Sequence, residues 1–352
     1  MMEPALKYDQ VDLSFASEYS APHFDDSLGT WVLSRYADVL AAFHCSSLSP
    51  AGLNSKPLSD RMPESLMHEM RRETRDALSP VQLRVWRRRL LSAARALIKN
   101  ISADQPVELL SAYARPACLT LAAMVTNIDL REAERLRGKA EPIATSAAEP
   151  FDAHLKASAR TANTKIRGCF RVGPEPLRDS GFVALAHTLP RLLANAWFTL
   201  LSSPGQWAVL HKDPKLAERA VEELLRCSGI PRILFRTAIQ DVEFNGVHIR
   251  KGERVMLKVL AANLDPQKFT SPHQLNVKQR RIRHLALGAG SHSCVGAGLI
   301  RMAAVSVSRP LFDKFSNAEL AKPVEWRGGS GYRFLPSLWV QFGVPSDLMN
   351  PE

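Results

Sequence analysis

At residues 287–296 the chain reads Leu287-Gly288-Ala289-Gly290-Ser291-His292-Ser293-Cys294-Val295-Gly296. The first two glycines allow the positive φ angles of a tight loop, and the third lets a helix begin directly behind the cysteine sulfur. Backbone amides at a helix N-terminus stabilise negative charge, so we expect them to lower the pKa of the Cys294 thiol. The segment therefore predicts an exposed thiolate that binds a metal.

Two other interpretations of this segment are weaker. A dinucleotide-binding loop needs Gly-x-Gly-x-x-Gly after a strand, and position 293 is serine. A single cysteine most often packs as a small hydrophobic residue, but here three glycines and a histidine surround it. The context therefore favours a metal ligand.

The segment resembles the proximal haem-binding loop of the cytochrome P450 superfamily, whose pattern is Phe-Gly-x-Gly-x-His-x-Cys-x-Gly. Only the first position differs, where Leu287 replaces phenylalanine. The resemblance implies a mainly α fold with a smaller β portion, the P450-like haem-thiolate fold. It also implies haem b (iron protoporphyrin IX) as the cofactor, with Cys294 on the iron and with Leu287, Gly288, His292 and Gly296 around the haem.

A second motif lies about seventy residues earlier. Glu223 and Arg226 are three positions apart on a predicted helix, so they share one face and can pair. They resemble the Glu-x-x-Arg motif of the family, whose ion pair supports the cysteine loop. The family usually adds an arginine from the following meander, but Gln274 stands there. The triad is therefore incomplete unless His273 or Gln274 supplies a neutral hydrogen bond.

The two carboxylates of haem need cationic or donor partners when they are buried. By resemblance, His292 and Arg236 contact a propionate, and His68 with Arg72 forms the His-x-x-x-Arg pair of the family. For His68 an exposed surface role is an equal alternative.

The oxygen-binding side departs from the family pattern. The run Ala-Gly-x-acid-Thr falls on residues 184–188, where Thr188 is kept and His187 replaces the acid. By resemblance these two are the catalytic residues that relay protons. Three roles stay open for His187: a substitute relay, a group that ligates or crowds the iron, or an ordinary helix residue. Pro190 predicts a kink just after the pair.

Composition limits the class of protein. The net charge is +11 and the pI about 9.6, which suggests nucleic-acid binding, but the arginines gather in two clusters, 84–89 and 278–283. By resemblance both lie on the cysteine side of the haem, where a ferredoxin or another acidic electron-transfer partner would dock; solvated helix faces are the alternative. We expect no nucleic acid, no membrane segment, no signal peptide and a cytoplasmic protein. Five scattered cysteines argue against a disulfide framework.

The hydrophobic pattern predicts the order of the elements. A strand at 31–33 feeds a helix, and helices follow over 64–77, 80–98, 108–125 and 131–139. A helix begins at Asp213-Pro214, a hairpin spans 242–249 around Asn245-Gly246, and a strand follows over 255–259. Pro310 should end the helix after the cysteine early. We expect a single domain over 1–352 with an abbreviated lid at about 140–180.

The resemblance implies a haem-thiolate monooxygenase that oxidises a small organic substrate, in specialised biosynthesis. The replaced acid leaves two alternatives open. One is an atypical enzyme that uses peroxide or catalyses a dehydration or rearrangement, and the other is a haem-binding protein without catalysis.

Overall fold

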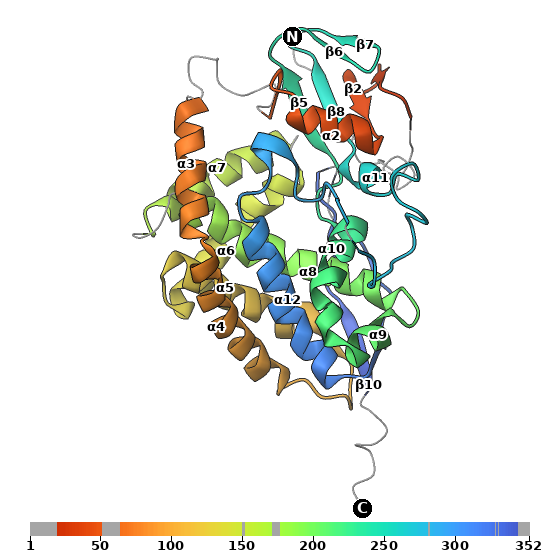
Figure 1. Cartoon of the computed structure of the whole chain (residues 1–352). Helices are drawn as coiled ribbons and strands as arrows, with labels where there is room; N and C mark the ends of the chain where they lie inside the picture. The colour runs from red at the N-terminus through yellow and green to blue at the C-terminus, as the bar shows by residue number, and fades with distance from the viewer. Residues whose placement is uncertain are drawn as a thin grey trace, which may run out of the picture.

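The structure of the chain, a computed structural model, describes residues 20–50, 64–149, 152–170, 177–280, 282–327, 329 and 331–343. It is mainly helical, with three small sheets, so the predicted fold class is confirmed. One sheet and helix α2 (Tyr36–His44) form one end of the molecule, and the long helices fill the rest (Figure 1). No described helix is both long and apolar enough to span a membrane.

The helical part contains the elements that position the site. Its α-helices are α3 (Glu64–Ala77), α4 (Pro80–Ile98), α5 (Arg115–Thr126), α6 (Leu130–Ala148), α7 (Ala153–Arg167), α8 (Leu189–Leu201), α9 (Gln206–Lys212), α10 (Ala217–Ser228), α11 (Val259–Asn263) and α12 (Ala297–Lys314). Short π or 3-10 turns are η2 (Leu110–Ala114), η3 (Leu177–Gly181), η4 (Ala184–Thr188), η5 (Pro214–Leu216) and η6 (Gly290–His292).

The five-stranded sheet has the order β1-β2-β8-β5-β3, made by β1 (His23–Asp25), β2 (Thr30–Leu33), β8 (Arg254–Leu257), β5 (Leu234–Ala238) and β3 (Leu48–Ser49). A three-stranded sheet joins β4 (Val107–Glu108), β10 (Trp339–Gly343) and β9 (Asn317–Leu320). The predicted hairpin is β6 (Val242–Phe244) with β7 (Val247–Ile249). Both turn residues have positive φ, 47° at Asn245 and 85° at Gly246, as an Asn-Gly turn requires.

The boundary between α3 and α4 follows the sequence signals. The Ser79 hydroxyl accepts a hydrogen bond from the Gln82 amide, and Pro80 occupies the first turn, where its missing N–H costs nothing. Helix α4 then buries Trp86, Leu90, Ala94 and Ile98 at four-residue spacing. Its arginines are left on the opposite, exposed face.

Helix α12 runs through the middle of the helical part, with α4 along one side and α10 along the other (Figure 1). Its buried face joins the main hydrophobic core, where Trp197 of α8 donates from its ring nitrogen to the Ser308 hydroxyl at 2.9 Å. This packing fixes the direction in which α12 leaves the cysteine loop.

Two sequence predictions about proline and helix length are wrong. Pro310 lies inside α12, which continues to Lys314 because Leu311 and Phe312, the two residues after the proline, are buried in the core. The helix expected over 131–139 extends to Ala148 and contains Pro142. Helix α7 follows it, so the described lid region is more helical than the weak pattern indicated.

Candidate functional site

The cysteine loop is closed by backbone hydrogen bonds. The Gly288 amide donates to the Leu285 carbonyl at 2.9 Å, and the Cys294 amide donates to the Leu287 carbonyl at 2.8 Å. Gly288 and Gly290 have φ of 70° and 66°, as the sequence predicts. A Cβ at Gly290 would also lie 2.7 Å from the carbonyl oxygen of Phe43. Both the positive φ and the lack of space therefore require glycine at this position.

The backbone of the loop acts on the thiol in the predicted direction, because the Gly296 amide lowers the pKa of Cys294. The charges of Arg71 and Arg301 lower it further. Burial of the sulfur, which the sequence did not show, outweighs them and raises the net pKa of the Cys294 thiol.

The predicted ion pair forms and is buried. Arg226 donates from Nε and from Nη2 to the Glu223 carboxylate, each at 2.8 Å. The side chain of Arg226 is 3% exposed and that of Glu223 is 2% exposed. The missing meander arginine is replaced by backbone groups. Arg226 donates to the carbonyls of Asn263 at 3.0 Å and Pro272 at 2.7 Å, and the Asn276 amide donates to Glu223 at 3.2 Å.

The side chains of His273 and Gln274 are exposed, and Gln274 contributes only its carbonyl oxygen, 3.4 Å from Arg226. Neither side chain therefore completes the triad, which is incomplete as the sequence indicates.

A second, partly buried network, which the sequence did not reveal, joins the residues on both sides of the loop. Glu222 of α10 accepts two hydrogen bonds from Arg301 of α12, at 2.6 and 3.0 Å. His284, which precedes the loop and has a side chain only 1% exposed, lies 3.4 Å from the same carboxylate. Burial raises the pKa of Glu222, but His284 and Arg301 outweigh it and bring the pKa to about 2. The anion thus joins both helices to the loop.

Helix α3 contacts the loop through Arg71, the residue next to the predicted haem-binding Arg72. Arg71 donates from Nη2 to the Ser293 carbonyl at 2.6 Å. The side chain of Arg72 is 68% exposed and lies 3.7 Å from Glu69, while His68 is exposed. Adjacent helical residues point about 100° apart, so Arg71 and Arg72 cannot both face the loop. The sequence alone did not show which of the two does.

Arg236 lies on β5 and is buried, with 6% of its surface exposed. Its Nη1 donates to the Phe235 carbonyl at 2.8 Å, while Nε has no partner among the described residues. The guanidinium is 5.4 Å from the ring of Phe43, the residue whose carbonyl approaches Gly290. A buried cation with a free donor therefore stands beside Phe43, which packs against the cysteine loop at Gly290.

The structure places His187 and Thr188 in the π turn η4, at the start of α8. Pro190 follows in the first turn of α8, so the departure from regular helix precedes the proline. His187 is buried and its ring faces α6: Nδ1 lies 2.9 Å from Glu141 and Nε2 lies 3.0 Å from the Arg137 carbonyl.

Both partners of the His187 ring are acceptors, so the contacts suit a ring that donates from both nitrogens. The His187 hydrogen bond is the largest cause that lowers the pKa of Glu141 to about 2, and Arg191 adds to it. With both nitrogens engaged by α6, neither is directed at a metal. This arrangement favours a structural role for His187 over the ligand role considered above.

Comparison with known proteins agrees with the fold and the motifs. The family model described as "Cytochrome P450" matches residues 211–316. Cytochrome P450 CYP107DY1 of Priestia megaterium is 40% identical over 157 residues, which cover 44% of this chain and 38% of that protein. The biotin biosynthesis cytochrome P450 of Bacillus subtilis is 36% identical over 162 residues, 46% of this chain and 41% of that protein.

Solved structures match over most of the chain. P450BioI, solved in complex with an acyl carrier protein, has a TM-score of 0.81 at 21% identity, covering 96% of this chain and 98% of that one. CYP164A2 of Mycobacterium smegmatis has a TM-score of 0.82 at 19% identity, covering 91% and 93%. The family model, the curated relatives and the solved structures together support the predicted resemblance to the cytochrome P450 superfamily. The curated relatives named here match over about two fifths of their own length.

Proposed function

We propose that the chain is a haem-thiolate monooxygenase that oxidises a small organic substrate. The observation that carries the proposal is the loop at 287–296, in which Arg71 donates to the Ser293 carbonyl next to Cys294. The Glu222 network binds the residues on either side of the loop, His284 and Arg301, and the Glu223–Arg226 pair binds the backbone of the segment that precedes it. A metal ligand needs such support around it.

The residues present fit haem b. Cys294 supplies the sulfur ligand, and the free Nε of buried Arg236 is a cation that needs an anionic partner such as a propionate. His292 in the loop, and Arg71 beside it, complete the set that would hold the cofactor. The chemistry that haem supplies is reductive activation of dioxygen, in which one oxygen atom enters the substrate and the other leaves as water.

On the opposite side of the proposed haem, η4 contributes Thr188. Its hydroxyl can pass a proton, while His187 is locked to Glu141 and Arg137 and fixes the rotation of the turn. We therefore assign His187 as a positioning residue and Thr188 as the group that handles the proton.

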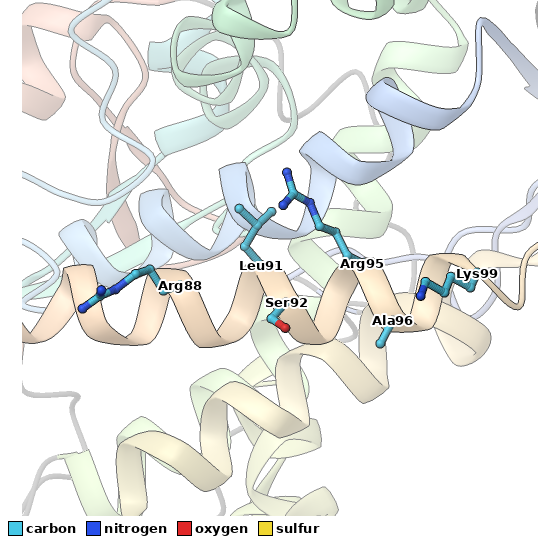
Figure 2. A pocket seen from close by; sticks show the side chains of 6 residues that line it. All are labelled: Arg88, Leu91, Ser92, Arg95, Ala96 and Lys99. Carbon is cyan, nitrogen blue, oxygen red and sulfur yellow. The ribbon is translucent and has the colours of Figure 1, made fainter.

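An acidic electron donor is the partner that the surface of α4 fits. The helix contains no acidic residue, and its exposed cations include Arg88, Arg95 and, just beyond its end, Lys99. These three line an open groove together with Leu91, Ser92 and Ala96 (Figure 2). Leu83 of α4 lies 3.4 Å from where a Cβ on Gly298 would stand, so α4 begins beside the first turn of α12, next to Cys294. Such a surface attracts an acidic protein.

The second basic cluster is exposed at Lys278, Arg280 and Arg283, whereas Arg281 lies outside the described residues. Its assignment to the same partner stays a prediction.

Turnover in two regimes tests the proposal. The haem-loaded protein is incubated with a metabolite panel, either with NADPH, ferredoxin reductase and ferredoxin, or with hydrogen peroxide alone. We expect product only with the electron donors. Product with peroxide alone would favour the peroxide-using alternative, which the replacement of the acid by His187 permits. Absence of product in both regimes would contradict catalysis.

The double variant Arg88→Glu/Arg95→Glu tests the donor surface separately. We expect slower reduction by ferredoxin, with an effect that shrinks as salt rises, and unchanged substrate binding. An unchanged rate of reduction by ferredoxin at low salt would contradict the proposal that the electron donor binds at α4.

A further inference from the structure

Arg232, in the short segment between α10 and β5, is a buried cation without a partner. Only 7% of its surface is exposed, and its Nε and Nη2 have no hydrogen-bond acceptor among the described residues. Its backbone is firmly held: the amide donates to the Gly331 carbonyl at 3.1 Å, and its carbonyl accepts from the Leu260 amide at 3.2 Å. An unpaired buried guanidinium costs stability, so a protein that retains one has a use for it.

A second arginine stands close to the first. Pro231 and Tyr332 form an antiparallel bridge, which brings the segment of Arg333 alongside that of Arg232. The Arg333 guanidinium stacks 3.7 Å from the centre of the Trp326 ring. Burial, followed by the charge of Arg232, lowers the pKa of Arg333 to about 10. The charge of Arg232 therefore acts on Arg333, and in the described part of the chain neither side chain forms an ion pair.

The pair lies between the two halves of the proposed site. On one side, Asn195 of α8 donates to the Arg333 carbonyl at 2.9 Å, and Arg191 of α8 stacks 4.0 Å from the Phe334 ring. On the other side, Tyr332 is close enough to Cys294 for the thiolate charge to contribute, after burial, to the raised pKa of its phenol. The strip at 331–334 therefore runs from the helix that follows Thr188 toward the cysteine loop.

We propose that Arg232 and Arg333 bind the carboxylate of an anionic organic substrate. Two guanidinium groups can each donate to one carboxylate, which relieves the repulsion between them and satisfies the free donors of Arg232. This inference rests on the proposed function, because it names the substrate class of the same site. It adds a specificity that the motifs do not contain, since neither arginine belongs to the loop or to the Glu223–Arg226 pair.

A haem propionate is the competing anion. Arg236 and Arg71 already supply cations at the cysteine loop, and Arg232 is four residues before Arg236 in extended chain, up to about 13 Å away. We therefore assign Arg236 to the cofactor and the Arg232–Arg333 pair to the substrate.

Binding of matched carboxylates and amides tests the assignment. The haem-loaded protein is titrated by calorimetry with decanoate against decanamide, and with 4-phenylbutyrate against 4-phenylbutyramide. We expect the carboxylates to bind more tightly. Arg232→Gln or Arg333→Gln should weaken carboxylate binding about 10- to 100-fold and change amide binding less than threefold. Arg309→Gln, at an exposed arginine 3.7 Å from Asp313, is the control and should change neither.

Three results would overturn the proposal: carboxylates that bind no more tightly than their amides, variants that keep wild-type carboxylate affinity, or an Arg232→Gln protein that loses haem as Arg236→Gln does. The last result would assign Arg232 to a propionate. Arg333→Gln, at a half-buried position, keeps the test valid should the change at Arg232 impair folding. Because binding is measured without turnover, an inactive protein that retains the carboxylate preference would contradict only the monooxygenase proposal.

Discussion

Replacing Glu223 by glutamine tests how the cysteine loop is supported. The change keeps the shape of the side chain but leaves the Arg226 cation, 3% exposed, without its counter-charge. Breaking a buried pair by removing one partner costs about 3–5 kcal/mol. The carbonyls of Asn263 and Pro272 still accept from Arg226 in the variant. We therefore expect a loss of unfolding free energy at the lower end of this range, about 3 kcal/mol.

The measurement is urea unfolding followed by far-UV circular dichroism. The control is Glu132→Gln, because Glu132 and Arg135 form an ion pair with the same three-residue spacing on the solvent side of α6, where their side chains are 30% and 50% exposed. We expect no measurable change there. A loss below about 1 kcal/mol for Glu223→Gln would refute the reasoning that this pair is a buried support.

Three further perturbations probe the loop and the lid. Gly290→Ala places a Cβ 2.7 Å from the Phe43 carbonyl at φ of 66°, so it should lower haem retention on gel filtration, whereas Gly138→Ala, with open space around it, should not. Arg71→Gln should weaken haem retention and Arg72→Gln should leave it unchanged; equal effects would contradict the contact with Ser293. Glu141 has a pKa lowered from 4.5 to about 2, so its contribution is present above pH 4.5 and is lost as pH falls toward 2. The melting temperatures of wild type and Glu141→Gln should therefore converge over that range, and a constant difference would disprove the coupling to His187.

Sequence reasoning succeeded where the constraint is local. The glycines at 288 and 290 need positive φ, Ser79-Pro80 begins a helix, and Asn245-Gly246 turns a hairpin, because each depends on neighbouring backbone alone. The Glu223–Arg226 pair is likewise one helical turn. These signals were sufficient to identify the family and the cysteine loop.

Sequence reasoning failed where the partner is distant or is a backbone group. The carbonyls that replace the meander arginine have no sequence signature, and Glu141 is far from His187 in the chain. The sequence indicated that the loop backbone lowers the thiol pKa but not that burial outweighs it, because burial depends on the whole fold. Arg232 and Arg333 meet only through the bridge between Pro231 and Tyr332, which no local pattern predicts.

The absorption spectrum of the reduced, carbon monoxide-bound protein tests the central claim most directly. Thiolate ligation by Cys294 predicts a red-shifted Soret band that is lost in Cys294→Ser and kept in Cys169→Ser, a change at a half-buried cysteine two residues after the end of α7. A red-shifted band that persists in Cys294→Ser would contradict the assignment of this sulfur to the iron.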